Sequence, residues 1–248
     1  FSKTFLTNSE VDEVLTKCEK YCVLDHEFGY AMTKKEIKER AKNLSKFILN
    51  DKISNIFLLN NEIKLSILKV IPRIKKKIIV SGWPRYDLKK KDFENIYSKS
   101  IRQIKKEYSN FFLFSSDFGI LSEEELGKLE KYYKLNGWAK KNINKETNIN
   151  NKRLITFQLF KKIIFEYEKL NNVPKLIIRP HPSENQKVWS KINKTLTKTK
   201  IILEQEIESW ILSSNGLIHN GCSSTIEGLN FQKKVFYLNI PGGYLRNS

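Results

Sequence analysis

Cysteine is scarce in this chain, and the few cysteines are not spaced for a structural role. Cys18, Cys22 and Cys222 form an odd set without a Cys-x-x-Cys pair or a Cys/His array at metal-site spacing. Neither a disulfide framework nor a structural zinc site is therefore indicated. A reducing compartment fits this cysteine usage best.

Long apolar runs are also missing, since no stretch approaches the roughly 20 residues of a membrane-spanning helix. Residues 1–8 contain neither an initiating Met nor the continuous apolar segment of a signal peptide. We therefore expect a soluble, cytoplasmic chain that is an internal part of a longer protein.

Several motifs of nucleotide-binding and hydrolytic enzymes are absent, namely G-x-G-x-x-G, a Walker-type loop and G-x-S-x-G. No Asp-x-Asp or His/carboxylate spacing suited to a divalent cation on phosphates occurs either. We therefore expect chemistry that needs neither a metal nor a cofactor.

Positive charge is abundant, because 45 Lys plus Arg against 27 Asp plus Glu give a net charge of +18. Such a balance suits an anionic partner, which includes nucleic acid, anionic lipid and phosphorylated or acidic substrates. Peripheral association with the inner face of the cell membrane is compatible with it. Lysine is common in helices and loops alike, however, so compositional bias explains much of the charge equally well.

Short apolar runs alternate with helical spacing along the whole chain, which predicts βαβ units and two parallel sheets. The expected strands are Tyr21–Leu24, Asn55–Leu59, Ile78–Gly82, Phe111–Ser116, Leu176–Arg179, Lys200–Glu204, Gly216–Asn220 and Lys234–Leu238. Thr33 and Glu36 predict a helix-starting capping box. We place a domain boundary near residue 107 and expect a polar break at Asn142–Asn151.

The stretch Leu176–Glu184 is the first candidate site, because a β-branched run ends abruptly in Arg179, Pro180, His181 and Pro182. The two prolines restrict the backbone on either side of His181. An Arg, a His and a helix start at a strand's carboxyl end suit a phosphate. The alternative is an ordinary strand-exit turn with a solvated His.

Gly221–Glu227 is the second candidate site. Ser223, Ser224 and Thr225 offer hydroxyls at a helix start, where a phosphate can bind, and Glu227 could accept hydrogen bonds from a ribose diol. Ser224 and Glu227 also have the spacing of a capping box, which would satisfy the same donors internally. Both interpretations stay open.

Asp25 and Glu27 are the third candidate site. In an extended chain, residues two apart face the same side, so both carboxylates could overhang a cleft and one could act as a general base. A solvated turn is the plainer interpretation, and His219 at its strand end is on its own most simply a hydrogen-bonded structural residue.

Taken together, these motifs resemble those of the bacterial surface carbohydrate biosynthesis proteins, which are similar to the CMP-sialic acid and CMP-Kdo transferases. The matching stretches, in chain order, are Leu24–Gly29, Gly82–Leu88, Ser115–Phe118, Arg179–Glu184 with Trp189, and His219–Thr225 with Glu227. The resemblance implies a GT-B-like α/β fold, in which two Rossmann-like domains with parallel sheets face a central cleft. Family members are longer, so we expect part of the N-terminal domain and the C-terminal tail to lie outside this chain.

The resemblance also implies a role for each part of the chain and for individual residues. Residues 1–107 would form the partial acceptor-side domain, and residues 108–248 the nucleotide-sugar-binding domain. Glu27, Asp25 and His181 are the expected catalytic residues. The expected nucleotide-binding residues are Arg179, His181, Pro182, Ser223, Ser224, Thr225 and Glu227. Arg85, Ser116, Asp117 and His219 are expected at the acceptor or along the cleft.

The function so implied is metal-independent transfer of an acidic sugar of the ulosonic acid type from a CMP donor to a bacterial surface glycan. The expected partners are the nucleotide sugar, a glycan or lipid-linked glycan acceptor, and no nucleic acid. A CDP-alditol phosphotransferase of the same fold is an alternative. A basic nucleic-acid-binding module is the rival from another class, although the basic residues lack interleaved stacking aromatics.

Overall fold

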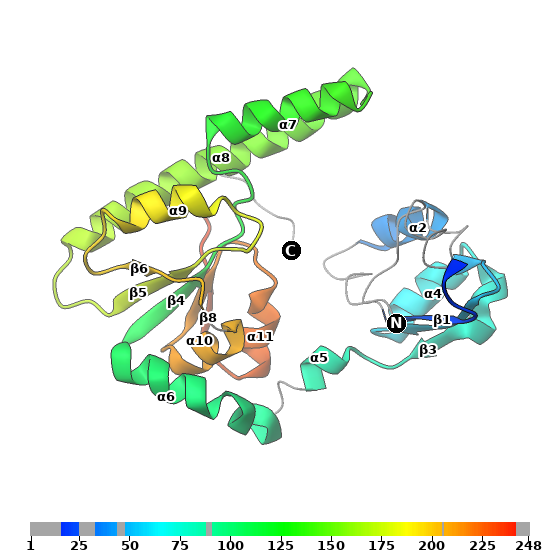
Figure 1. Cartoon of the computed structure of the whole chain (residues 1–248), viewed down its shortest axis with the longest axis horizontal. Coiled ribbons are helices and arrows are strands. Elements are labelled where there is room, and N and C mark those ends of the chain that lie inside the picture. Colours follow the sequence, from blue (N-terminus) through cyan, green and yellow to red (C-terminus); the bar gives the residue numbers. More distant parts are fainter. Residues whose placement is uncertain (1–15, 25–32, 44–47, 88–90, 205, 242–248) are drawn as a thin grey trace. The chain divides into compact units, whose positions relative to one another are not determined.

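A computed structural model describes residues 16–24, 33–43, 48–87, 91–204 and 206–241. The chain divides into two compact units, residues 1–88 and 89–248 (Figure 1). Each unit has its own parallel sheet and its own buried core. The predicted α/β class with two parallel sheets is therefore confirmed.

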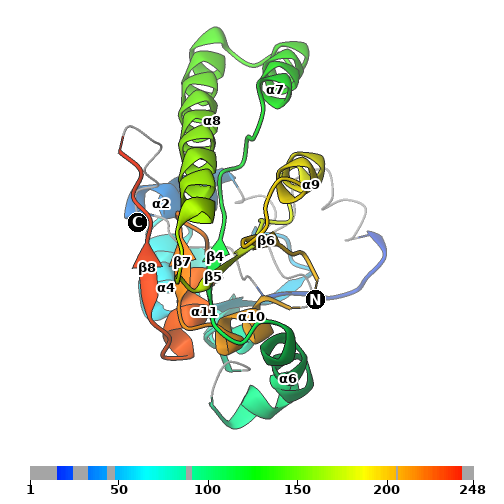
Figure 2. The same cartoon turned by 90° about the vertical axis from the view of Figure 1, so that its left-hand side faces the viewer.

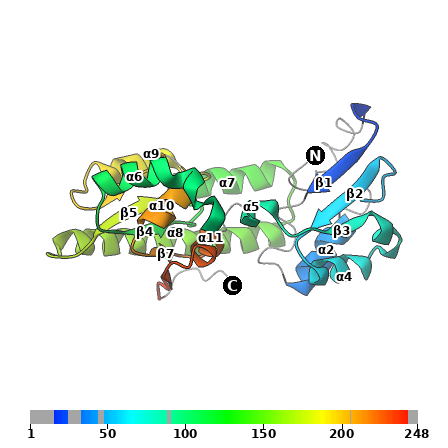
Figure 3. The ribbon, with the colours of Figure 1, turned by 90° about the horizontal axis from the view of Figure 1, so that it is seen from below.

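The first unit is built on a three-stranded parallel sheet in the order β1-β2-β3. Its elements are β1 (Tyr21–Leu24), α2 (Lys34–Asn43), β2 (Ile53–Leu58), α4 (Asn61–Leu68), the 3-10 helix η1 (Pro72–Lys77) and β3 (Ile78–Val80). Helix α4 packs against β2 and β3, and α2 packs against α4 (Figure 3). Isoleucine side chains from the sheet and from α4 fill this core, since Ile56, Ile63 and Ile67 are all buried.

The capping box predicted for α2 is present. Thr33 Oγ1 accepts from the Glu36 backbone N–H at 3.3 Å, and Glu36 Oε2 accepts from the Thr33 backbone N–H at 2.7 Å. These reciprocal bonds satisfy donors that a helix start leaves open. The predicted capping box is confirmed, and α2 begins at Lys34, directly after Thr33.

The second unit is built on a five-stranded parallel sheet in the order β6-β5-β4-β7-β8. Its strands are β4 (Phe111–Ser115), β5 (Lys175–Arg179), β6 (Lys200–Ile201), β7 (Leu217–His219) and β8 (Val235–Tyr237). The chain adds strands on one side of β4 first, and then returns to add β7 and β8 on the other side. The strand order therefore reverses between β4 and β7.

Helices cover both faces of the second sheet (Figure 2). The described α-helices of this unit are α6 (Ser98–Glu107), α7 (Glu123–Leu135), α8 (Lys140–Lys169), α9 (Gln186–Asn193), α10 (Ile207–Ser213) and α11 (Ser224–Asn230). Helix α7 packs on α8 and does not cover the sheet. Phe114 of β4 packs in one core with side chains of α8 and α9, whereas Leu113 packs in a second core with side chains of α6 and α10. This alternation is the two-residue period of a strand buried on both faces.

The boundary between the units lies earlier than predicted. Ahead of the predicted boundary near residue 107 the chain forms α5 (Pro84–Asp87), the 3-10 helix η2 (Lys91–Tyr97) and α6 in succession. Helix α6 packs on α10, and its Ile104 is buried in the second unit's core. Helix α6 therefore belongs with the second sheet, because Ile104 is buried in its core and Ile101 packs against the same core.

The predicted polar break at Asn142–Asn151 is wrong, because these residues lie inside the 30-residue helix α8. Helix α7 packs along α8, and Asn150 is buried. Such tertiary contacts override the weak helix propensity of asparagine. Despite the length of α8, none of the described helices combines enough length with enough apolar character to cross a bilayer.

Candidate functional site at the carboxyl edge of the second sheet

Three strand exits meet at the carboxyl edge of the second sheet. Strand β4 lies between β5 and β7, and Ser115 is in register with both Arg179 and His219. The segments that follow these strands, residues 116–119, 180–184 and 220–223, therefore start side by side. In open α/β sheets, ligands bind at this edge, beside the point where the strand order reverses.

Glu184 joins the first two of these segments. Its carboxylate is 3% exposed and accepts from Ser116 Oγ at 2.6 Å and from the backbone N–H of Phe118 at 2.6 Å. It also accepts from Trp189 Nε1 at 2.9 Å. Because the buried carboxylate receives donors from β4's exit and from α9, it holds the two loops in one arrangement.

Burial raises the pKa of Glu184, while the hydrogen bonds from Ser116, Phe118 and Trp189 act in the opposite direction. All of these groups are donors, and an ionised carboxylate only accepts. The geometry is therefore that of a buried carboxylate that organises loops.

His181 carries a free ring nitrogen at this edge. Its Nδ1 accepts from the Ser183 backbone N–H at 3.2 Å and lies 2.6 Å from Ser183 Oγ. A neutral ring that accepts at Nδ1 carries its proton on Nε2. Within the described part of the chain, no hydrogen bond involves Nε2, so this half-buried side chain keeps a donor for a ligand.

The backbone of His181 is fixed as firmly as its ring. Its N–H donates to Ser116 Oγ at 3.2 Å, and its carbonyl accepts from the Glu184 N–H at 2.9 Å. Ser116 thus bonds to both Glu184 and His181. The predicted cleft residue Ser116 is fully buried, and its role in the structure is to connect β4's exit to β5's exit.

The third exit is tied to the first by two contacts. Asn220 Oδ1 accepts from the Asp117 backbone N–H at 2.8 Å, and Ser115 Oγ donates to Cys222 Sγ at 3.2 Å. Residues from all three exits therefore belong to one hydrogen-bonded network. The Asp117 side chain is half-buried beside it.

His219 is held within its own turn. Its Nδ1 accepts from the Gly221 backbone N–H at 3.2 Å and lies 2.9 Å from Thr225 Oγ1. The ring contacts Tyr237 at a centroid distance of 5.3 Å. Burial lowers the pKa of His219, which favours the neutral ring.

The capping box considered for Ser224 and Glu227 does not form. Helix α11 begins at Ser224, its N-cap is Ser223, and no side chain caps it. The hydroxyl of Ser224 is buried and has no hydrogen-bond partner among the described residues, whereas Ser223 is exposed. Glu227 is 2% exposed, one turn into the helix.

Gly221 makes this turn possible. Its φ of 115° lies where residues with a side chain are strained. The glycine therefore lets the chain turn directly from β7 into α11.

Arg179 is engaged elsewhere than expected. Its guanidinium donates to the carbonyl oxygen of Glu204, in the segment after β6. Burial lowers the pKa of Arg179, and the charges of Glu206 and Glu208 oppose that shift. In this arrangement Arg179 fastens β5 to the segment that follows β6, which competes with a contact to phosphate.

The remaining candidates differ in position. Pro182 is exposed beside His181. Asp25 and Glu27 lie outside the described residues. Arg85 belongs to α5 in the first unit, and its side chain is also outside the description.

A cavity of about 460 Å³ lies along the β6 edge of the second sheet, next to the exit of β5, since its lining residue Gln186 donates to the His181 carbonyl at 3.4 Å. Its lining includes Trp189, Asn193, Leu203, Glu204 and Trp210. None of the residues predicted for nucleotide binding lines it. We base the candidate site on the strand exits, because their polar groups converge and those of the cavity come from scattered helix faces.

Sequence reasoning missed two residues of this network, Glu184 and Asn220. Glu184 was recognised only as part of a helix start and a motif, and Asn220 only as a strand end. The available signal was the position of each residue after a strand predicted to be buried, where a polar side chain is close to neighbouring exits.

Comparisons with known proteins give a match in fold. No protein-family model matches the chain, and no curated protein matches its sequence. Among solved structures it is similar to the crystal structure of Methanocaldococcus jannaschii UDP-GlcNAc 2-epimerase in complex with UDP-GlcNAc and UDP, with a TM-score of 0.51 and 16% identity. The match covers 93% of this chain and 63% of that protein, so the chain spans less than two thirds of its length.

The fold is GT-B-like. Two parallel sheets flanked by helices, and the similarity to a nucleotide-sugar enzyme of this fold class, carry that assignment. At this identity the similarity concerns the fold alone. It does not single out the CMP-sialic acid and CMP-Kdo transferases that the sequence motifs resemble.

Proposed function

We propose that this chain is part of a nucleotide-sugar enzyme that holds the donor's phosphate at the carboxyl edge of the second sheet. The observation that carries the proposal is the convergence of three strand exits in one hydrogen-bonded network, with a donor left over at His181 Nε2. Open α/β sheets bind nucleotides at such an edge.

The chemistry assigned to this edge is stabilisation of charge on a leaving nucleotide. His181 Nε2–H and the exposed hydroxyl of Ser223 would donate to phosphate oxygens. Their backbones are fixed before the ligand arrives, so little reorganisation is needed as negative charge develops. Glu227 lies one helix turn deeper, where a ribose contact is our assignment.

We further propose that the donor is a CMP-activated acidic sugar and the acceptor a surface glycan, on the strength of the ordered sequence motifs. Glu27, with Asp25 beside it, is proposed to take the acceptor's proton, which contributes a factor of about 10² to 10⁴ in rate. Glu27→Gln should reduce turnover by that factor and leave donor binding unchanged. An unaffected turnover would remove Glu27 from the mechanism.

The proposal holds that no metal takes part. Turnover should therefore be unchanged after exhaustive treatment with a chelator. A loss of turnover that added Mg²⁺ or Mn²⁺ restores would contradict this part of it.

A thermal-shift panel of CMP, CDP, UDP and GDP tests the nucleotide assignment. A ligand that binds only the native state raises the melting temperature as its concentration exceeds Kd. We expect stabilisation by CMP or CDP, and a smaller stabilisation at the same ligand concentration in His181→Ala. No response to any of the four would overturn the proposal.

A UDP-sugar enzyme is the second candidate, because the solved structure that this chain resembles is a UDP-GlcNAc 2-epimerase. The two candidate functions share the phosphate site and differ in the nucleobase of the donor, which is cytosine in one and uracil in the other. Stabilisation by UDP without stabilisation by CMP or CDP would favour the UDP-sugar enzyme. Binding to nucleic acid that weakens steeply with salt, with no response to nucleotides, would favour a nucleic-acid module instead.

A further inference from the structure

The α7–α8 hairpin extends beyond the body of the second unit (Figures 1 and 2). Helix α7 has no buried residue, and the buried residues of α8 begin only at Asn150. The far half of the hairpin therefore packs only on itself. We call residues 131–141, which contain the turn between the two helices, the hairpin tip.

Large apolar side chains are exposed at the hairpin tip. Tyr132 is 57% exposed, Leu135 is 76% exposed and Trp138 is 43% exposed. Single exposed apolar residues are common on soluble proteins, but a cluster of them at a protruding end marks an interaction site.

The turn holds these side chains in place. Trp138 donates its backbone N–H to the Tyr133 carbonyl at 3.1 Å, and the rings of the two residues stack at a centroid distance of 4.5 Å. Gly137 adopts a φ of 68°, which glycine does without strain, and Asn136 Nδ2 donates to the Tyr132 carbonyl at 2.8 Å. The apolar residues are thus presented on a rigid end.

The hairpin tip carries only positive charges, and the acidic residues nearest to it along the chain are Glu130 and Glu146. Lys131, Lys134, Lys140 and Lys141 are all exposed at the tip, and residues 131–141 contain no acidic residue. The acidic cluster of the hairpin lies at its base, in the first turn of α7.

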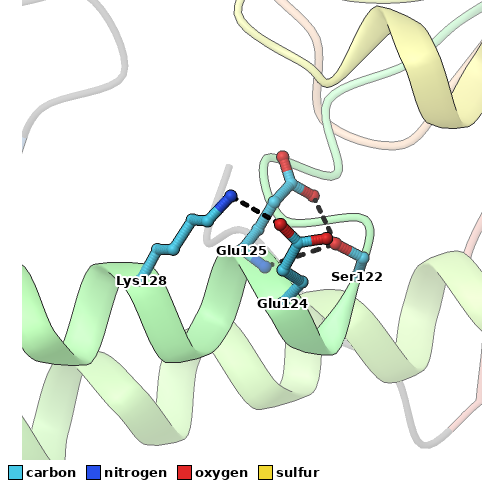
Figure 4. Close-up of polar contacts among 4 residues, drawn as sticks. All are labelled: Ser122, Glu124, Glu125 and Lys128. Atoms are coloured by element: carbon cyan, nitrogen blue, oxygen red, sulfur yellow. Dashed lines mark hydrogen bonds and ion pairs between the residues drawn. The ribbon is translucent and has the colours of Figure 1, made fainter.

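Glu124 and Glu125, in the first turn of α7, have hydrogen-bond and ion-pair partners within α7 or at its N-cap (Figure 4). Ser122 Oγ accepts from the Glu125 N–H at 3.3 Å, and Glu124 pairs with Lys128 at 2.5 Å. The helix dipole favours acids at the start of α7 and bases at its end. It does not explain the exposed Trp, Tyr and Leu among the tip lysines.

We propose that the hairpin tip docks on an anionic membrane surface. Trp and Tyr prefer the membrane interface, where the ring is buried and the polar group stays hydrated. Lysines can rest their carbon chains on apolar surface and place the ammonium among lipid phosphates. Peripheral docking would bring the enzyme to a lipid-linked acceptor, although the proposal does not depend on the proposed catalytic function.

Two other occupants fit the tip less well. A second copy of the chain docking tip to tip would oppose its lysines to identical lysines, which repel. Single-stranded nucleic acid binds in basic grooves with stacking aromatics, whereas Leu135, the most exposed of the three large apolar residues at the tip, has no ring, and the tip protrudes from the unit (Figure 1). A flat anionic surface that accepts apolar side chains matches the exposed apolar residues of the tip, its lysines and its protruding position.

Vesicle co-sedimentation of the full chain tests the proposal. The chain should bind vesicles of phosphatidylcholine mixed with phosphatidylglycerol and bind phosphatidylcholine alone at least tenfold more weakly. Lys140→Glu with Lys141→Glu should reduce binding to the mixed vesicles about tenfold or more. Leu135→Ser with Trp138→Ala should do the same at low and at moderate salt.

The matched control is Lys75→Glu with Lys76→Glu, which makes the same charge change at exposed residues of the first unit. It should bind vesicles much more tightly than the tip variants. His181→Ala should bind vesicles like the parent chain. Failure of the membrane proposal can therefore be distinguished from failure of the proposed nucleotide site.

Brominated lipids give a second readout, because they quench tryptophan that enters the interface. Quenching should be lost in Trp138→Phe, while Trp83, Trp189 and Trp210 are buried and should not respond. Vesicle binding that survives both tip variants would overturn the proposal. Tip-dependent self-association, or tip-dependent binding to single-stranded DNA, without vesicle binding would also overturn it.

Discussion

At the scale of single residues, the candidate site depends on one buried carboxylate more than on the residues expected to touch a ligand. Glu184 accepts hydrogen bonds from Ser116, Phe118 and Trp189. These bonds position the turn that carries His181. A substrate-binding role for His181 therefore rests on the support that Glu184 supplies.

Glu184→Gln should destabilise the second unit. The amide replaces one accepting oxygen with a donor that meets the Ser116 hydroxyl or the Trp189 N–H. We expect a loss of about 2 kcal/mol in the free energy of unfolding, measured by urea denaturation. Glu166→Gln is the control, because its carboxylate is exposed and, among the described residues, pairs only with Lys169. Equal stability of the two variants would contradict the organising role of Glu184.

His181→Ala should weaken nucleotide binding about tenfold, which corresponds to about 1.4 kcal/mol, and leave stability within about 0.5 kcal/mol. Among the described residues, the side chain bonds only to Ser183 and does not contribute to either core of the second unit. Isothermal titration with the nucleotide that stabilises the parent chain measures the first effect. Ser183→Ala, which removes the local partner of Nδ1, is the matched control and should bind nearly normally. A variant that unfolds while its soluble fraction binds normally would make His181 structural.

At the scale of elements, Glu168 fastens the end of α8 to the loop before β6. Its Oε2 accepts from the backbone N–H groups of Thr197 at 2.7 Å and Lys198 at 3.0 Å, and its Oε1 accepts from Thr199 at 2.6 Å. Burial alone would raise the pKa of Glu168, but the hydrogen bonds from Lys198, Thr197 and Thr199 lower it to about 2.

The sign of the pH effect follows from that shift. A carboxyl with a depressed folded pKa stabilises the protein fully above its unfolded value of 4.5, and this stabilisation is lost as pH falls toward about 2. Glu168→Gln should cost about 1 kcal/mol at neutral pH, because the group is partly exposed. The melting temperatures of parent and variant, measured from pH 7 down to pH 2, should converge on the acid side. A constant difference across that range would contradict the assignment.

At the scale of the whole molecule, each unit has its own parallel sheet and its own buried core, as an independently folding domain does. Within the part of the chain that the structure describes, the core of the first unit draws on residues up to Ile78, and the two cores of the second unit draw on residues from Tyr97 onward. Neither sheet takes a described strand from the other unit.

A fragment of residues 89–248 should therefore fold alone and keep the nucleotide response of the full chain. We expect a cooperative thermal transition and the same ligand selectivity in the thermal-shift panel. The matched comparison is a fragment of residues 108–248, cut at the boundary expected from sequence, which lacks α6 and leaves the α10 face uncovered. Equal stability of the two fragments would show that α6 is dispensable.

The sequence by itself determined the local structure and the order of the motifs. Tyr21–Leu24 forms the expected strand, Thr33 and Glu36 form the expected cap, and the Arg179–Pro182 turn follows a buried strand. These features depend on neighbours a few residues away, through hydrophobic period, capping spacing and the restricted backbone of proline. Local rules were therefore sufficient for them.

Only the tertiary structure decided which distant residues meet. The order β6-β5-β4-β7-β8 brings Ser116, Glu184 and Asn220 into one network, and Arg179 bonds to Glu204 across the sheet edge. The contact with α7 turns the polar stretch 142–151 into helix. These outcomes depend on packing between segments far apart in the chain, and several partners of equal local propensity compete for each contact, so no short window of sequence specifies them.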